Sequence, residues 1–169
     1  MRILLVDDDE GFRATLRQLL TQGGRSVQVQ EAGDGEQAVQ MVAARPPDVV
    51  LMDLTMPRVN GIEATRRLKV RWPALPVLIL TVHDDPVYER TARAAGADGF
   101  LLKKTAGTAL WPALASLVPP GRPAGPERAS FAASPLVTDP PETGRPRARE
   151  DSPEPLGNRP DWQACWRPL

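Results

Sequence analysis

The sequence predicts an α/β protein in which a doubly wound, five-stranded parallel sheet is followed by a C-terminal tail. Two observations lead to this fold class. Short apolar runs rich in valine, isoleucine and leucine alternate five times with stretches in which apolar residues recur at helical spacing. A parallel strand can follow another only through a crossover, usually a helix, so the alternation favours a sheet with helices on both faces.

Four of the predicted strands are continuously apolar, as strands buried on both faces of a sheet are. The other one alternates valine with polar residues, which indicates a half-exposed edge strand. In chain order the expected strands are residues 3–6, 27–29, 49–52, 77–80 and 99–102.

Cap and stop signals bound the five predicted helices. They are expected between Phe12 and Gly23-Gly24, between Asp34-Gly35 and Pro46-Pro47, between Gly61 and Pro73, between Pro86 and Gly96, and from Thr108 to Val118. Pro112 lacks the amide proton that a residue in the body of a helix donates. We therefore expect the last helix to start late or to kink.

Polar groups stand directly after four of the predicted strands. Asp7 and Asp8 follow the first strand, Asp53 the third, Thr81 the fourth and Lys103 the fifth. The carboxyl ends of parallel strands meet at one edge of a sheet, where open α/β sheets bind their ligands. We expect these side chains to form a single site.

Three carboxylates close together repel each other, and at least one pKa rises unless a cation lies between them. Oxygen ligands with room for water and a phosphate suit Mg²⁺ better than a closed calcium cage. In such a site Lys103 and Thr81 can hold phosphoryl oxygens, while Asp53 can attack phosphorus and form an acyl phosphate.

Over residues 1–118 these motifs resemble the receiver domains of two-component response regulators. The matching segments are Val6-Asp7-Asp8, Asp53-Leu54-Thr55-Met56-Pro57, Leu80-Thr81 and Gly99-Phe100-Leu101-Leu102-Lys103. The resemblance implies a flavodoxin-like receiver fold and a signalling switch rather than an enzyme. It implies that Asp53 accepts a phosphoryl group from a histidine kinase or a phosphotransfer protein, and that the receiver forms homodimers on phosphorylation.

The resemblance also implies roles for single residues. A Mg²⁺ ion would be held by Asp8, by Asp53, by the backbone carbonyl of Thr55 and, through water, by Asp7. Thr81 and Phe100 would move on phosphorylation, with Thr81 drawn to the phosphoryl group and Phe100 filling the space it leaves. Thr55 and His83 stand where this family flanks the path of water to the acyl phosphate.

Lys104 is a departure from the many receivers that carry proline after the lysine. This ending looks more like regulators that carry a LuxR-type helix-turn-helix, yet residues 119–169 show no such pattern, so the sequence does not support DNA binding. A LuxR-type transcriptional regulator shortened after its receiver is therefore one alternative.

Two alternatives from other classes are weaker. A Mg²⁺-dependent phosphohydrolase with an Asp nucleophile usually has a second acid where Thr55 stands. A flavin-binding module on the same fold is disfavoured because the acidic loop after the first strand would repel the cofactor phosphate.

Composition excludes several other classes. The 21 basic and 21 acidic residues balance, so no overall field attracts nucleic acid or anionic lipid. The single cysteine, Cys165, allows no internal disulfide framework. No apolar run approaches the roughly 18 residues of a membrane span. We expect a cytoplasmic protein that does not contact the membrane.

The composition changes near Val118. Twelve of the 19 prolines lie in residues 119–169, a segment with few aliphatic residues and no amphipathic period. It cannot bury enough apolar surface to offset its ordering entropy, so the sequence predicts a disordered tail. Trp162 and Trp166, four residues apart, leave open a short helical anchor for a partner groove.

Deleting residues 119–169 is therefore expected to leave the stability of the receiver nearly unchanged. Thermal denaturation of residues 1–118 beside the full chain, at one fixed Mg²⁺ concentration, measures the difference. A midpoint lowered by more than about 5 °C, which is roughly 1 kcal/mol for a domain of this size, would show that the tail is structural.

Overall fold

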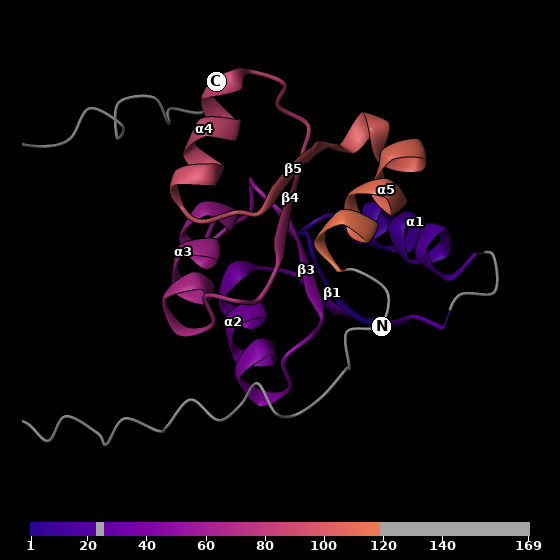
Figure 1. Cartoon of the computed structure of the whole chain (residues 1–169), viewed down its shortest axis with the longest axis horizontal. Helices are drawn as coiled ribbons and strands as arrows, with labels where there is room; N and C mark the ends of the chain where they lie inside the picture. Colours follow the sequence, from indigo (N-terminus) through magenta and orange to yellow (C-terminus); the bar gives the residue numbers. More distant parts are fainter. Residues whose placement is uncertain (23–25, 119–169) are drawn as a thin grey trace, which may run out of the picture. The chain divides into compact units, whose positions relative to one another are not determined.

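A computed structural model describes residues 1–22 and 26–118 and shows one five-stranded parallel sheet in this part of the chain (Figure 1). The strands are β1 (Arg2–Val6), β2 (Gln28–Ala32), β3 (Val49–Asp53), β4 (Val77–Thr81) and β5 (Gly99–Leu102). Their order across the sheet is β2-β1-β3-β4-β5, and all neighbours are parallel. The predicted fold class is confirmed, with the order of the strands reversing between β1 and β3, where such sheets bind ligands.

Helices cover both faces of this sheet, as the predicted crossovers require (Figure 1). They are α1 (Glu10–Thr21), α2 (Gly35–Ala44), α3 (Gly61–Arg71), α4 (Pro86–Ala94) and α5 (Ala106–Leu117), with a short 3₁₀ helix η1 (Lys103–Thr105) before α5. Helices α1 and α5 pack on one face, and α2, α3 and α4 pack on the other.

The core lies in two apolar layers, one on each face of the sheet. Successive side chains of a strand point to opposite faces, so neighbouring residues of β3 enter different layers: Met52 packs toward α2–α4, and Leu51 packs toward α1 and α5. Strands β3 and β4 are buried along their whole length. The polar residues that end these strands are therefore held on rigid backbone.

Four of the five connections that leave the carboxyl edge of the sheet end in helix caps. In four helices the residue before the first turn has a side-chain oxygen that accepts a hydrogen bond from a backbone amide of that turn, at 2.8–3.0 Å. The capping residues are Asp9, Asp34, Asn60 and Asp85. Such caps satisfy amides that would otherwise lack a partner, and they fix the loops before the helices.

Some predicted boundaries differ from the structure. Strand β2 begins at Gln28 and extends to Ala32, and β3 includes Asp53. The last helix does not start late: α5 begins at Ala106, before the predicted Thr108, because η1 leads directly into it, and Pro112 lies inside the helix. The alternative, a kink at Pro112, stays a prediction. The predicted stop at Gly23-Gly24 and the predicted tail, residues 119–169, lie outside the described residues.

Thr65 in α3 supplies a test of the core. Its side chain is fully buried, and its hydroxyl has no hydrogen-bond partner in the part of the chain that the structure describes. Thr65→Val keeps the shape and removes the unsatisfied group, so we expect the free energy of unfolding to rise by about 1 kcal/mol in denaturant titration.

Thr65→Ser is the matched control, because it keeps the hydroxyl and removes the methyl group. It is expected to lower the free energy of unfolding by about 1 kcal/mol. A valine variant less stable than the wild type would show that the hydroxyl is hydrogen-bonded in solution.

Candidate functional site

Three charged side chains meet at the carboxyl edge of the sheet, as the strand ends predict. The Nζ atom of Lys103 lies 2.6 Å from Oδ2 of Asp7 and 3.3 Å from Oδ2 of Asp53. Lys103 reaches them from the end of β5, past β4, which separates β5 from β3. All three side chains are nearly inaccessible, with exposed fractions of 12%, 1% and 6% for Lys103, Asp7 and Asp53. Buried charges of this kind require a partner, and here each has one.

The second oxygen of each buried carboxylate accepts a backbone amide. Asp7 Oδ1 accepts from the amide of Asp9 at 3.0 Å, and Asp53 Oδ1 accepts from the amide of Leu54 at 2.8 Å. Both carboxylates are therefore held in one orientation by the backbone on one side and by Lys103 on the other.

Asp8 completes an acidic cluster with Asp7 and Asp53. Each of the three offers an oxygen atom, and these atoms lie within 4.8 Å of one another. Asp7 and Asp53 are buried, whereas Asp8 is exposed, so the cluster opens to solvent on the Asp8 side. A set of carboxylate oxygens with an open side fits a hard divalent cation that keeps some of its water.

The pKa of Asp53 is raised to about 6, from an ordinary value of 3.8. Burial is the main cause, and the neighbouring charge of Asp7 adds to it, while Lys103 and the Leu54 amide act in the opposite direction. Burial alone would lower the pKa of Lys103, but its hydrogen bond to Asp7 and the charges of Asp53 and Asp7 raise it. Lys103 therefore stays charged, and a divalent cation would favour the ionised form of Asp53.

Thr81 ends β4 and is fully buried at the same edge of the sheet. Its hydroxyl oxygen accepts a hydrogen bond from the amide of His83 at 3.1 Å. Phe100 lies on β5 opposite Ile79 and packs, partly buried, against the layer beneath α2–α4. The structure thus places Thr81 and Phe100 on the paired strands β4 and β5.

Thr55 and His83 face each other across the two loops that follow β3 and β4. Thr55 Oγ1 and His83 Nε2 are 3.3 Å apart. The imidazole also stacks on the ring of Tyr88 in α4, with centroids 4.5 Å apart. The two residues that the family resemblance places beside the path of water are therefore in contact with each other.

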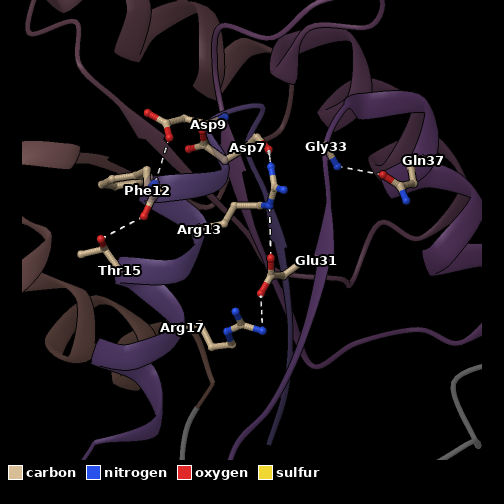
Figure 2. Close-up of polar contacts among 10 residues, drawn as sticks. Asp7, Asp9, Phe12, Arg13, Thr15, Arg17, Glu31, Gly33 and Gln37 are labelled. Carbon is tan, nitrogen blue, oxygen red and sulfur yellow. Dashed lines mark hydrogen bonds and ion pairs between the residues drawn. The ribbon is translucent and has the colours of Figure 1, made fainter.

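Sequence reasoning missed two residues of α1 that support the site. Phe12 served only as the start of the first predicted helix, but Lys103 Nζ lies 4.5 Å from the centre of its ring, a cation–π distance. Arg13 donates to the backbone carbonyl of Asp7 at 2.7 Å and pairs with Glu31 of β2 at 3.2 Å, as Figure 2 shows. Arg17, one turn further along, holds the other oxygen of Glu31 at 3.2 Å. The only sequence signal was two arginines four residues apart on one helix, and their partner on β2 follows only from the fold.

The sequence of this chain matches a known protein family. The model of the response regulator receiver domain matches residues 3–115. The chain belongs to the response regulator receiver family. Receivers are signalling modules of two-component systems, and they generally bind Mg²⁺ in an acidic pocket, which the cluster of Asp7, Asp8 and Asp53 fits.

Individual relatives agree with this membership. The receiver is 42% identical over 110 residues to the transcriptional regulatory protein DegU of Brevibacillus brevis, covering 65% of this chain and 47% of that protein. It is 44% identical over 106 residues to the transcriptional activator protein ExaE of Pseudomonas putida, covering 63% and 50%. The chain thus spans about half the length of these curated relatives.

Solved structures extend the comparison. The receiver domain of NarL from Mycobacterium tuberculosis aligns with a TM-score of 0.65 at 34% identity, over 72% of this chain and 97% of that one. A LuxR-family response regulator from Aurantimonas aligns with a TM-score of 0.66 at 34% identity, over 76% and 91%. The predicted similarity to LuxR-type receivers is confirmed.

No helix within residues 1–22 and 26–118 is long and apolar enough to cross a bilayer.

The raised pKa of Asp53 makes the stability of the metal-free receiver depend on pH. Between the ordinary pKa of 3.8 and the folded value of about 6, the folded state keeps a proton that the unfolded chain has released. Ionised Asp53 therefore costs stability above the folded pKa, and Asp53→Asn removes that cost. The stability advantage of Asp53→Asn should grow on the order of 2 kcal/mol from roughly pH 4 to pH 7.

Urea titrations across this pH range, with a chelator present, measure the difference. Glu10→Gln, which removes an exposed carboxylate in the first turn of α1, is the matched control for the loss of one carboxylate. A difference between Asp53→Asn and the wild type that stays constant with pH would contradict the raised pKa.

Proposed function

We propose that this receiver accepts a phosphoryl group on Asp53 from a histidine kinase or a phosphotransfer protein and signals by a change of conformation. The observation that carries the proposal is the arrangement around Asp53. Its carboxylate lies at the end of the fully buried strand β3, is held by Lys103 at 3.3 Å and belongs to the acidic cluster with Asp7 and Asp8. No separate substrate pocket is needed, because the incoming group arrives on a partner protein.

Asp53 is the nucleophile in this proposal. One carboxylate oxygen forms a bond to phosphorus as the bond from phosphorus to the donor nitrogen breaks, and the imidazole that leaves keeps the electron pair and takes up a proton. Lys103 then holds a phosphoryl oxygen as a fixed positive charge. The amide of Leu54 keeps the carboxylate oriented during the attack, since it donates to Asp53 Oδ1.

Four groups would hold a Mg²⁺ ion at this site: Asp8, Asp53, the backbone carbonyl of Thr55, and Asp7 through a water molecule. When bound there, the ion would neutralise charge on the phosphoryl oxygens and on the carboxylates. The assignment is supported by the three carboxylate oxygens that lie within 4.8 Å of one another.

Thr81 and Phe100 form the proposed switch. The Thr81 hydroxyl accepts only the His83 amide among the hydrogen bonds described above, so its proton can be donated to a new phosphoryl oxygen. Movement of buried Thr81 would vacate volume that the ring of Phe100, on the adjacent strand, can fill. Thr55 and His83, which contact each other at 3.3 Å across the loops after β3 and β4, would affect the access of water to the acyl phosphate.

Regulation of transcription is the second candidate function, and it concerns what the whole protein does after phosphorylation. The observation that favours it is the similarity to DegU and ExaE, both described as regulators or activators of transcription. We propose residues 1–118 as the receiver domain and homodimerisation on phosphorylation as its response. DNA binding is not part of the proposal, because the described residues form a receiver alone.

A Mg²⁺-dependent phosphohydrolase fits less well. Thr55 occupies the position where such an enzyme needs its second acid, and only residues 54–60 separate β3 from α3, which leaves no cap to enclose a substrate. The chemistry of a receiver is confined to its own phosphorylation and dephosphorylation.

Phosphorylation of Asp53 can be tested directly. Incubation of the full chain with acetyl phosphate and Mg²⁺ should add one phosphoryl group by intact-protein mass spectrometry, and Asp53→Asn should abolish the addition. Asp84→Asn, an exposed carboxylate paired with Lys104, should label like the wild type.

Equal labelling of Asp53→Asn would refute the assignment. Sustained multiple-turnover release from an aryl phosphate, well above stoichiometric labelling, would favour the phosphohydrolase instead.

A further inference from the structure

The loop between β3 and α3, residues 54–60, is tied to the start of α2 at two points. Arg58 forms an ion pair with Asp34 through Nη2 and Oδ2. The amide of Gly35 donates to the carbonyl of Val59 at 3.2 Å. Neither Asp34 nor Arg58 belongs to the acidic cluster, yet both act on the loop that leaves Asp53.

Arg58 has an unusual backbone conformation. Its φ is 62°, and it is the only non-glycine residue with a positive φ in residues 1–22 and 26–118. This left-handed conformation is unfavourable for a residue with a Cβ atom, and single residues adopt it only where local contacts compensate. The Arg58 side chain is 68% exposed, so little packing holds it, and the contact that the structure shows is the ion pair with Asp34.

Asp34 is a fixed partner for this contact. It is 7% exposed, and its Oδ1 accepts the amide of Gln37 at 2.8 Å, which leaves Oδ2 for Arg58. The side chain of Gln37 in turn accepts the amide of Gly33 at 2.8 Å, as Figure 2 shows. The Gln37 amide and Arg58 both lower the pKa of Asp34, so its charge persists at neutral pH.

The backbones of the loop and of α2 also touch. A Cβ atom at Gly35 would lie 2.6 Å from the carbonyl oxygen of Val59 and 2.8 Å from Cβ of Ala64. The loop therefore cannot shift toward α2, and the ion pair compensates the unfavourable backbone conformation that Arg58 would relieve by shifting away. Gly61 closes the loop, since its amide donates to the carbonyl of Leu54 at 3.0 Å.

We propose that Asp34 is a positioning residue for the Mg²⁺ site. By holding Arg58 in the left-handed conformation, Asp34 fixes the β3–α3 loop and with it the backbone carbonyl of Thr55. Magnesium demands near-ideal octahedral geometry, so a displaced carbonyl ligand lowers its affinity. This inference rests on the proposed function, because it assumes that the Thr55 carbonyl binds the metal.

Three variants distinguish the effect of losing the Asp34–Arg58 ion pair from the effect of losing the helix cap at Asp34. Asp34→Ser keeps a capping oxygen, but its side chain is too short to reach Arg58 as well. Arg58→Ala keeps a Cβ atom at the strained position and has no partner for Asp34. Arg58→Gly removes the strain, since glycine adopts positive φ readily.

Titration calorimetry of the full chain with MgCl₂ is the first measurement. We expect Asp34→Ser and Arg58→Ala each to raise the Kd about tenfold, the lower end of the effect of removing a residue that supports metal ligands. Arg58→Gly should stay within about twofold of the wild type, and Asp34→Ser should have little further effect in the Arg58→Gly background.

Amide hydrogen exchange of the metal-free chain is the second measurement. The amides of Gly35 and Gly61 donate to the carbonyls at the two ends of the loop. They should exchange faster in Asp34→Ser and Arg58→Ala and at the wild-type rate in Arg58→Gly. Amides in β3 serve as the reference for global stability.

Two results would overturn the inference. One is a Kd that Asp34→Ser leaves unchanged while the wild type binds Mg²⁺. The other is an equal loss of affinity from Asp34→Ser in the wild-type and Arg58→Gly backgrounds, which would mean that Asp34 acts only through the cap of α2. Absence of Mg²⁺ binding by the wild-type chain would instead overturn the proposed function itself.

Discussion

The ammonium group of Lys103, buried between Asp7 and Asp53, is the contact on which the arrangement of the site depends. Two carboxylates this close and this buried would repel each other strongly without a cation. Lys103 supplies that charge from β5, so a single side chain links the carboxyl ends of β1, β3 and β5 across β4. This contact therefore holds the side chains of Asp7, Asp53 and Lys103 in one arrangement.

The loops around this contact are short and anchored at both ends. The loops after β1 and β3 each leave a buried strand and end in a capped helix, and residues of chemical interest lie between the two. Asp8 lies between β1 and the cap at Asp9, and Thr55 lies between β3 and the cap at Asn60. Capping thus leaves these residues little conformational freedom, which would lower the entropy cost of binding a small cation there.

Sequence patterns predicted the sheet, its helices and the four strand ends because these follow from local regularities. Continuous apolar runs mark buried strands, and parallel strands bring their carboxyl ends together whatever the details of the loops. The contacts of Arg13, Phe12 and Asp34 were not predictable in this way. Asp34 and Arg58 are 24 residues apart, and nothing local indicates that a loop arginine adopts positive φ beside the cap of another helix. The late start expected from Pro112 was wrong for the opposite reason, since a local rule gave way to the helix that η1 initiates.

The cap of α3 also bears on the chemical durability of the chain. Asn60-Gly61 is the dipeptide in which asparagine deamidates most readily, by attack of the glycine nitrogen on the side-chain carbonyl. In the fold the Asn60 side chain is engaged with the amide of Glu63 at 2.9 Å, and the Gly61 nitrogen donates to Leu54. The side chain of Asn60 and the nitrogen of Gly61, which would react with each other, are thus held in other hydrogen bonds. Glycine is required at residue 61, because a Cβ atom there would lie 1.9 Å from the carbonyl oxygen of Asp53. The fold therefore requires a dipeptide that is prone to deamidation, and its hydrogen bonds protect Asn60 from this reaction while the protein stays folded.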